Sequence, residues 1–406
     1  AEEFMTATNN YRKERWKLDN EVAPYGNTDP SSVQPVSLAY TDSEISSAGK
    51  GTDWFDEVTR DDVPLVGGKG ANLGEMTNAN IPVPPGFIVT ADAYFDFLKQ
   101  TKLMDKVREL LEPVDANDSK QLQRVAAEIR QLIQEAPMPE EIANKIREAY
   151  VKMGEGLVAV RSSATAEDMP EASFAGQQRT FLNVQGKDEV VKAVQGCWAS
   201  LFEARAIFYR EQQGFDHFKV GLAVPVQKMV ESEASGVMFT IEPVTNDNSK
   251  IVIEAVFGLG EALVSGEVTP DLFVVDKETQ RIISKKIAKQ EWQLIRNTDG
   301  SGREANVQVA LPLSSQNQQK ISDGDIIRLA NLAKQLEEHY QCPQDIEWAK
   351  EDKQIFIVQT RPVTTIKETA EVTPEVEAPV LLSGTPASPG MASGPVKIVY
   401  HASQID

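Results

Sequence analysis

The segment from residue 160 to residue 183, VRSSATAEDMPEASFAGQQRTFLN, most constrains what this chain can fold into. Residues 157–160 predict a short strand that leads into Arg161, and residues 180–184 predict a second strand. The small residues between them let backbone N–H groups turn toward a ligand, and Arg161 adds fixed positive charge with planar donors. The loop between these strands has about 16 residues, and loops of that length inside a compact domain are usually functional or disordered. The segment therefore predicts a loop that covers a phosphate, with a solvent-exposed hairpin loop as the alternative. The chain contains no GxxxxGK[ST] pattern, so this is not a Walker loop.

Length and charge narrow the class of protein. The chain has 406 residues, enough for two or three domains, and its 41% hydrophobic and 25% charged residues are typical of globular proteins. It has no apolar run of the roughly 18 residues that a membrane helix needs. The net charge of −20 argues against binding to nucleic acid or anionic membranes, so a polyanion such as ATP would need a locally basic pocket. Cys197 and Cys342 form no CxxC pair and the N-terminus shows no signal pattern, so we expect a cytoplasmic protein.

Composition changes along the chain and predicts its domains. Residues 1–50 are polar and predict an extension that is poorly ordered or docks on a partner. Residues 51–225 and 226–365 mix helices and strands without strict alternation, which favours an α+β fold over a doubly wound sheet. Residues 366–381 are acidic and contain prolines, as is typical of a stiff linker. Residues 382–406 are too few for a domain and are expected to form the start of one.

Hydrophobic periodicity predicts the individual elements. We expect Thr90 to cap a helix that contains Tyr94, Phe95 and Leu98, after a rigid turn and strand in IPVPPGFIVT. Further predicted helices span residues 122–133, 140–153, 188–209 and 326–340. Further predicted strands span residues 222–230, 236–241, 251–256, 272–275 and 355–359.

Lys69 lies in VGGKGANLG, a glycine-rich turn that leads into a helix. A lysine flanked by glycines at a helix N-terminus is well placed to bind an anion together with free backbone N–H groups. A surface lysine in a turn is the alternative. The pattern therefore adds a second candidate phosphate ligand to Arg161.

Two acidic segments predict contacts with the rest of a nucleotide. Residues 224–243 read as two apolar strands joined by an acidic turn, where backbone groups can hold adenine with Glu231 or Glu233 near the ribose. An ordinary hairpin with charged residues at its tip is the alternative. Glu254 and Glu261 flank FGLG, whose glycines indicate a close approach of the backbone to a ligand. Two exposed acidic side chains are the alternative there.

Glu347 and Gln359 predict a metal site. They lie on two strand-like segments separated by the polar turn KEDKQ, so a hairpin would bring them together. Oxygen ligands of this kind suit Mg²⁺, which is typically shared with nucleotide phosphates. Arg361 then supplies a permanent cation for the same phosphates. A hairpin with a surface ion pair is the alternative.

Taken in order, the motifs of this chain resemble the nucleotide-binding part of the phosphoenolpyruvate synthase (pyruvate, water dikinase) family. They are VGGKGANLGEM, IPVPPGF, VRSSATAEDMPEASFAGQQ, SGVMFT, GLGEALVSG, DIEWA and IVQTRPVT. The resemblance covers residues 52–366, and pyruvate phosphate dikinase and rifampicin phosphotransferase share the architecture and some of the motifs. It implies an ATP-grasp-type domain in which two subdomains, 51–225 and 226–365, hold ATP. Residues 382–406 are similar to the start of the family's swivelling phosphohistidine domain.

The resemblance also implies site residues. The implied phosphate ligands are Lys69, Arg161, Ser162, Thr165, Gly176 and Gln177. The implied ligands of the rest of the nucleotide are Gln227, Met229, Glu231 and Glu261. The implied Mg²⁺ ligands are Glu347 and Gln359. Arg161 and Arg361 are the implied catalytic residues, because phosphoryl transfer depends on positioning and charge neutralisation.

In that family the ATP domain passes a β,γ-pyrophosphoryl group to a histidine on the swivelling domain. The complete enzyme converts ATP, pyruvate and water to AMP, phosphoenolpyruvate and phosphate. The family's TxxHxA-type histidine context does not occur in this chain. The resemblance therefore implies a phosphotransferase module that binds MgATP but is incomplete on its own, with a swivelling domain in cis or in trans as its partner. The alternatives are a subunit of a split dikinase that acts on another acceptor, and a non-catalytic scaffold whose residues 1–50 bind an unknown partner.

Overall fold

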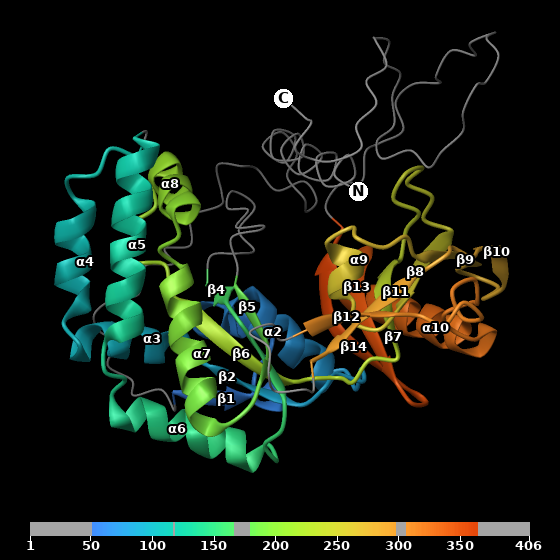
Figure 1. Ribbon diagram of the computed structural model, residues 1–406, viewed down its shortest axis with the longest axis horizontal. Helices are drawn as coiled ribbons and strands as arrows, with labels where there is room; N and C mark the ends of the chain where they lie inside the picture. Colours follow the sequence, from blue (N-terminus) through green and yellow to red (C-terminus); the bar gives the residue numbers. More distant parts are fainter. Residues whose placement is uncertain (1–50, 117, 166–178, 298–305, 364–406) are drawn as a thin grey trace, which may run out of the picture. The chain divides into compact units, whose positions relative to one another are not determined.

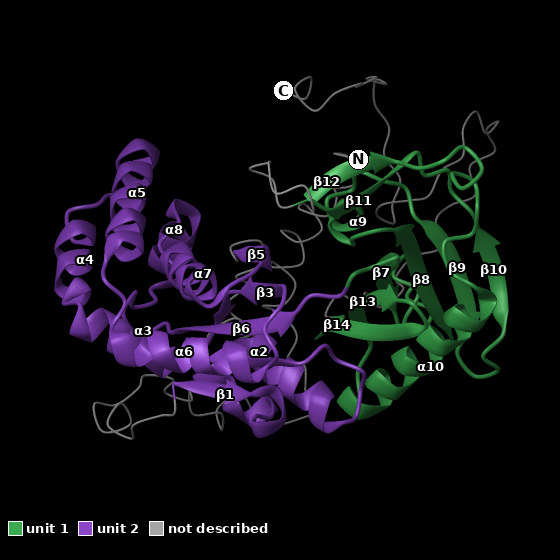
Figure 2. Cartoon of the chain, turned by 60° about the horizontal axis from the view of Figure 1, so that its bottom comes forward, with its two compact units in different colours: residues 1–22, 231–406 green, residues 23–230 purple. Residues whose placement is uncertain are grey.

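A computed structural model describes residues 51–116, 118–165, 179–297 and 306–363 (Figure 1). Contacts divide the chain into two compact units, unit 2 with residues 23–230 and unit 1 with residues 231–406 and 1–22 (Figure 2). Both units contain helices and antiparallel sheets, which confirms the α+β class. Among the described residues, no helix is both long and apolar enough to cross a membrane. The predictions for residues 1–50, 366–381 and 382–406 lie outside the described residues.

The main sheet of unit 2 has the strand order β1-β2-β6-β3-β5, and β4 pairs with β6. All of these pairs are antiparallel, and the central strand β6 buries all of its residues except the last. The strands predicted on either side of the loop are confirmed, since β3 pairs with β5. The strands are β1 (Thr52–Trp54), β2 (Gly86–Val89), β3 (Val158–Arg161), β4 (Ser163–Ala164), β5 (Thr180–Val184) and β6 (Leu222–Lys228).

The helices of unit 2 begin and bury their faces largely as the sequence predicts. The predicted cap is confirmed, because the Thr90 hydroxyl accepts a hydrogen bond from the Ala93 N–H at the start of α3. Helix α5 buries Leu122, Val125 and Ile129 along one face. The helices are η2 (Phe55–Glu57), η3 (Arg60–Asp62), α2 (Val63–Asn78), α3 (Ala91–Gln100), α4 (Leu103–Leu111), α5 (Ser119–Glu135), α6 (Glu140–Lys152), α7 (Lys187–Ser200) and α8 (Ala204–Gln213).

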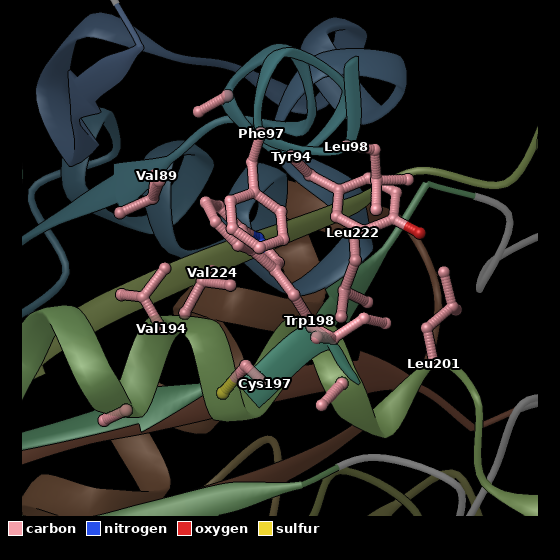
Figure 3. Packing of buried hydrophobic residues seen from close by; sticks show 14 of the residues in the cluster. Val89, Tyr94, Phe97, Leu98, Val194, Cys197, Trp198, Leu201, Leu222 and Val224 are labelled. Carbon is pink, nitrogen blue, oxygen red and sulfur yellow. The ribbon is translucent and has the colours of Figure 1, made fainter. Parts of the chain in front are cut away.

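The core of unit 2 is organised around Trp198 of α7, which is fully buried (Figure 3). Its ring centroid lies 5.1 Å from that of Phe97 and 6.0 Å from that of Tyr94, both on α3. Aromatic side chains of this size contribute most to core stability. This packing holds α3 and α7 together over the sheet strand that carries Leu222 and Val224.

The helix predicted over residues 188–209 is wrong in one respect, because the structure has two helices there. Helix α7 ends at Ser200, and Glu203 is extended (φ −68°, ψ 145°) before α8 begins. The Leu201 carbonyl is freed by this break and accepts a hydrogen bond from the buried guanidinium of Arg210, at 2.7 Å. The apolar pattern does not reveal the break because Leu201 and Phe202 stay in the same core.

The two strands predicted within residues 224–243 are confirmed, but they do not form the hairpin that was the alternative interpretation. Strand β6 pairs with β2, β3 and β4 in unit 2, whereas β7 (Ala234–Phe239) pairs with β8 and β13 in unit 1. Both strands lie inside their sheets, so each takes its hydrogen bonds from other strands. The acidic segment between them connects the two units, and the Glu233 N–H donates to the Lys350 carbonyl of unit 1.

Unit 1 contains a six-stranded antiparallel sheet in the order β10-β9-β8-β7-β13-β14. Helix α10 packs on it through Ile326, Leu329, Ala333 and Leu336, and Ser322 caps the helix (Figure 1). A separate ribbon pairs β11 with β12. The elements are β7 (Ala234–Phe239), β8 (Lys250–Phe257), α9 (Glu261–Val264), β9 (Asp271–Asp276), β10 (Ile282–Lys286), β11 (Trp292–Arg296), β12 (Asn306–Ala310), α10 (Asp323–Tyr340), β13 (Gln344–Glu351) and β14 (Gln354–Pro362).

Candidate functional site

Lys69 lies just after a break in helix α2. Gly67 adopts non-helical angles (φ 67°, ψ 168°), so a second helical segment starts immediately before Lys69. The backbone N–H groups of Lys69 and Gly70 donate to the hydroxyl of Ser163, at 3.1 and 3.4 Å. The expectation that these N–H groups are free to bind an anion is therefore wrong. The Lys69 ammonium, which donates to the Ser162 carbonyl at 3.4 Å, is the group that can contact a phosphate.

The base of the predicted loop is held by hydrogen bonds to the backbone. The Ser162 hydroxyl donates to the Arg179 carbonyl at 3.1 Å and accepts from the Arg179 N–H at 2.8 Å. Thr165 and Gly221 bond in the same reciprocal way, since the Thr165 N–H donates to the Gly221 carbonyl and the Gly221 N–H donates to Oγ1. Both side chains are buried. They hold the ends of the loop, whose residues Gly176 and Gln177 lie outside the described residues.

Positive charge gathers at this base. Arg161 ends β3 directly opposite Thr180 of β5. Arg179, which the sequence reasoning missed, precedes β5 and stacks its guanidinium over Phe181 at 5.1 Å from the ring centroid. Burial raises the pKa of the Cys197 thiol, while the charges of Arg179 and Lys69 act in the opposite direction on it. The base of the loop is thus a locally basic region in an acidic chain, the condition that binding of a polyanion requires.

Gln227 and Met229 lie at the end of β6. Gln227 pairs with Gly86 on one side and Ala159 on the other, and its side chain is buried. Its amide nitrogen Nε2 has no hydrogen-bond partner among the described residues. The Met229 N–H donates to the Leu157 carbonyl at 2.9 Å. An unpaired buried donor is costly, so Gln227 fits a ligand that presents an acceptor.

Two of the acidic residues predicted to contact the nucleotide, Glu231 and Glu261, have side-chain partners within unit 1. Glu231 forms an ion pair with Arg296 at 2.8 Å. Glu261 starts helix α9, and its carboxylate accepts from the Asn306 side-chain amide at 2.7 Å. Both lie near solvent, where such pairs rearrange at little cost in free energy.

The predicted hairpin of the metal site is confirmed. Strands β13 and β14 pair antiparallel, and Glu347 lies directly opposite Gln359. The Gln359 carbonyl oxygen Oε1 is buried and has no hydrogen-bond partner among the described residues. The Arg361 guanidinium donates twice to one oxygen of Asp345, at 2.8 and 2.6 Å.

Register places these side chains on one face of the unit 1 sheet. A row runs across the strands through Leu272, Glu254, Val237, Glu347 and Gln359. All five are only partly buried, whereas their neighbours along the strands are buried, except Val358 at the register shift of β14. Since α10 covers one face of the sheet, this row, with its three polar side chains, lies on the face opposite α10.

Glu254 is the residue of this row that sequence reasoning singled out without assigning it to the site. Burial, and secondarily the charge of Asp345, raise its pKa to about 7. A carboxyl group with this pKa is half protonated near neutral pH and would ionise fully beside a cation. Glu254 lies in the same row as Glu347 because of the register of β8 with its neighbouring strands, which the sequence alone does not predict.

The donors of this face fit Mg²⁺. Glu347 and Gln359 offer hard oxygen ligands, and the Oε1 atom of Gln359 lacks a partner among the described residues, as a metal ligand would before the ion binds. No group of three or more histidine, cysteine, aspartate or glutamate residues in the described part of the chain could hold a metal ion. A cation here would therefore take its remaining ligands from water and from the phosphates of a nucleotide.

Comparison with known proteins identifies the family. The model of the pyruvate phosphate dikinase AMP/ATP-binding domain matches residues 63–379. The probable phosphoenolpyruvate synthase of Methanocaldococcus jannaschii is 50% identical over 363 residues, which cover 87% of this chain and 30% of that protein. The phosphoenolpyruvate synthase of Pyrococcus furiosus is 49% identical over 398 residues, covering 87% of this chain and 49% of that protein.

Other similarities are more distant. The phosphoenolpyruvate synthase of Aquifex aeolicus is 42% identical over 388 residues, covering 87% of this chain and 45% of that protein. Among solved structures, D-alanyl-alanine synthetase A from Vibrio cholerae matches 74% of this chain and 60% of that chain with 11% identity, but a TM-score of 0.26 does not define a shared fold. The chain spans half or less of the length of the synthases described above. It belongs to the pyruvate phosphate dikinase AMP/ATP-binding domain family and corresponds to the ATP-binding domain of phosphoenolpyruvate synthases.

Proposed function

We propose that this chain is the MgATP-binding module of a phosphoenolpyruvate-synthase-like dikinase and donates the β,γ-phosphoryl groups of ATP to a histidine on another domain. One observation carries the proposal most directly. Within the region that matches the family, Glu347 and Gln359 lie opposite each other on the sheet face away from α10 and offer hard oxygen ligands. This is the ligand chemistry of a magnesium ion shared with a nucleotide.

In this proposal Lys69, Arg161 and Arg361 bind the phosphates, as the family resemblance implies. The Arg361 guanidinium is held in place by Asp345. Mg²⁺, when bound, would neutralise phosphate charge. The arginines act as catalytic residues by stabilising the charge that is redistributed during transfer, and their planar donors suit phosphate oxygens.

The adenine and ribose are proposed to bind at the end of β6. The Gln227 amide supplies a buried donor without a partner among the described residues, and Met229 lies two residues further along the chain. Glu231 and Glu261 are proposed to reach the nucleotide by exchanging their present surface partners for it. The proposed phosphate cover is formed by the loop whose ends Ser162 and Thr165 hold.

The proposed acceptor is a swivelling phosphohistidine domain, present in cis or in trans. The aligned region covers 30% and 49% of the two relatives, so they carry further domains. The complete enzyme would convert ATP, pyruvate and water to AMP, phosphoenolpyruvate and phosphate.

Arg161→Ala tests the proposed phosphate site. Loss of a charge-assisted bond to a phosphate costs about 1.5–3 kcal/mol, so we expect the Kd of a non-hydrolysable ATP analogue to rise by about ten- to a hundredfold. Isothermal titration calorimetry measures this change. Arg205→Ala, which removes an exposed arginine of α8 in the same unit, is the matched control and should bind normally. Equal affinity of Arg161→Ala and the unmodified chain would refute the assignment.

Turnover tests the proposed role of a separate acceptor. With Mg²⁺ and ATP alone, the chain should release AMP only very slowly, because the family's acceptor-histidine motif does not occur in its sequence. Adding a separately produced phosphohistidine domain of a close relative should label that histidine from γ-³²P-ATP or β-³²P-ATP. Rapid AMP formation without any acceptor domain would show that the chain passes the phosphoryl groups to water or to an acceptor of its own.

A further inference from the structure

We infer that Ser163 is a positioning residue that fixes Lys69 for the phosphates of the nucleotide. The inference rests on the proposed function, since it assigns the residue through which one of the proposed phosphate ligands is held. Ser163 belongs to β4, which is hydrogen-bonded to Ala223 of the central strand β6. Its side chain is completely buried, so it has no direct access to a ligand in solution.

The Ser163 hydroxyl is inserted into the hydrogen-bond ladder of helix α2. In an unbroken helix, the Gly70 N–H would donate to the Val66 carbonyl four residues earlier. Here the Gly70 N–H donates to Ser163 Oγ at 3.4 Å, and Oγ in turn donates to the Val66 carbonyl at 3.2 Å. The Lys69 N–H also donates to Oγ, at 3.1 Å. A side chain inserted in this way is one of the few known causes of a helix kink.

Gly67 makes this insertion possible. Its φ of +67° is strained for any residue with a side chain, and an added Cβ would lie 2.2 Å from Ser163 Oγ and 2.4 Å from the Ser163 carbonyl oxygen. The positive φ of Gly67 and its close approach to Ser163 belong to one arrangement. The chain turns at Gly67 so that the Ser163 hydroxyl can cap the helical segment that follows. Ser163 thus acts as an N-cap supplied by a distant part of the chain.

The cap determines where the Lys69 side chain starts. Since the Lys69 N–H is fixed to Ser163 and the ammonium donates to the carbonyl of the adjacent Ser162, both ends of the lysine are held against the base of the loop. Arg161 lies in the same short segment, at the end of β3. Ser163 therefore couples the lysine on α2 to the arginine that precedes the loop.

Removal of the hydroxyl should release this coupling. In Ser163→Ala, the Gly70 N–H and the Val66 carbonyl would each lose a buried partner, and the helix could close across Gly67 to pair them directly. Closing the kink rotates Lys69 about the helix axis, away from the base of the loop. The consequence for the nucleotide should be confined to its phosphates, because Gln227 belongs to β6 and Met229 directly follows that strand, so neither lies on α2.

The test measures binding of Mg²⁺ with a non-hydrolysable ATP analogue, and of adenosine, to the full 406-residue chain. We expect Ser163→Ala to weaken binding of the analogue by about tenfold and to leave adenosine binding unchanged. Lys69→Ala should show at least as large a loss, and Ser163→Ala should add little in the Lys69→Ala background, because both changes remove one coupled unit. Ser200→Ala is the matched control, since it deletes another buried serine hydroxyl that bonds to a helix carbonyl.

The outcomes separate the two claims. Failure of the unmodified chain to bind the analogue would overturn both the proposed function and the inference. Normal binding together with additive losses in the double variant, or a Ser163→Ala effect of equal size on adenosine, would overturn the inference alone. Ser163→Cys, which keeps the shape of the side chain but is a weak donor and acceptor, serves if Ser163→Ala does not fold. Loss of folding in both variants would also overturn the inference, because Ser163 would then be needed for the fold as a whole.

Discussion

At the scale of single residues, burial sets the behaviour of Glu254. Burial of its carboxyl, and secondarily the negative charge of Asp345, raise its pKa from 4.5 to about 7. The folded chain therefore keeps a proton that the unfolded chain releases between these two pH values, and stability falls as the pH rises through this window. A shift of this size corresponds to roughly 3 kcal/mol. Such a residue is destabilising on its own and becomes favourable only beside a cation.

Glu254→Gln should remove this penalty. The variant and the unmodified chain should have similar urea midpoints below pH 4.5, and the variant should be more stable by up to about 3 kcal/mol above pH 7. Urea denaturation at pH 4.5, 6 and 8 measures the difference. Glu338→Gln, an exposed change on α10, is the control and should leave the pH dependence of the unmodified chain in place. A Glu254→Gln chain that gains no stability between pH 4.5 and 8 would contradict this account.

His217 has the opposite pH dependence. Its Nδ1 atom accepts a hydrogen bond from the buried Arg210 guanidinium at 2.8 Å, and its Nε2 lies 2.7 Å from Glu211. Burial, and then the charge of Arg210, lower the pKa of His217, although Glu211 and Asp216 act against this. As the pH falls, the unfolded chain therefore binds a proton at His217 before the folded chain does. Stability is fully present above pH 6.5 and is lost as the pH falls through the lowered pKa.

His217→Asn should reduce this loss, because the Asn side chain offers Arg210 an acceptor that does not titrate. We expect the thermal midpoint of the unmodified chain to fall more steeply between pH 6.5 and 5 than that of the variant. His339→Asn, on α10 in the other unit, should leave the dependence in place. Parallel pH curves for the unmodified chain and His217→Asn would rule out His217 as the titrating group.

At the scale of elements, the sequence predicted those features that residues close together in the chain determine. The hairpin of β13 and β14 follows from two alternating runs around a polar turn, and its register brings Glu347 opposite Gln359 as expected. The strands that pair with β6 and those that pair with β7 were not predictable in this way, because these partners are distant in sequence. The glycines around Lys69 predicted a turn before a helix, but not that α2 would begin before this turn or that the Ser163 hydroxyl, far along the chain, would cap the segment after it.

A close approach of two strands explains Gly236 of β7. A Cβ at this position would lie 1.9 Å from the Glu254 carbonyl oxygen of β8 and 2.7 Å from the ring of Trp348 on β13. Gly236→Ala should therefore separate strands of the sheet and destabilise the chain by 1–3 kcal/mol or more, measured as a lower urea midpoint. Gly154→Ser is a useful comparison, because a Cβ there meets no atom within 4 Å, although its φ is +93°. A Gly236→Ala chain as stable as the unmodified one would show that β7 has room for a side chain.

At the scale of the whole molecule, the sequence predicted a list of candidate site residues but not their arrangement. Lys69, Arg161, Glu347, Gln359 and Arg361 were all predicted from their motifs, and their roles stay predictions. Residues that act through long-range packing were missed or left unassigned: Arg179, Ser163 and Glu254. Their roles depend on which strands pair and on how deeply a side chain is buried, and a single sequence specifies neither.

The measurement that tests the central claim most directly is a calorimetric titration of a non-hydrolysable ATP analogue with and without Mg²⁺, for the unmodified chain and for Glu347→Ala. We expect binding by the unmodified chain to require Mg²⁺, and the Glu347→Ala variant to lose at least tenfold in affinity, because it lacks the carboxylate opposite Gln359. Thermal melts establish that the variant is folded. Binding that is indifferent to Mg²⁺, or unchanged in folded Glu347→Ala, would contradict the proposed MgATP site.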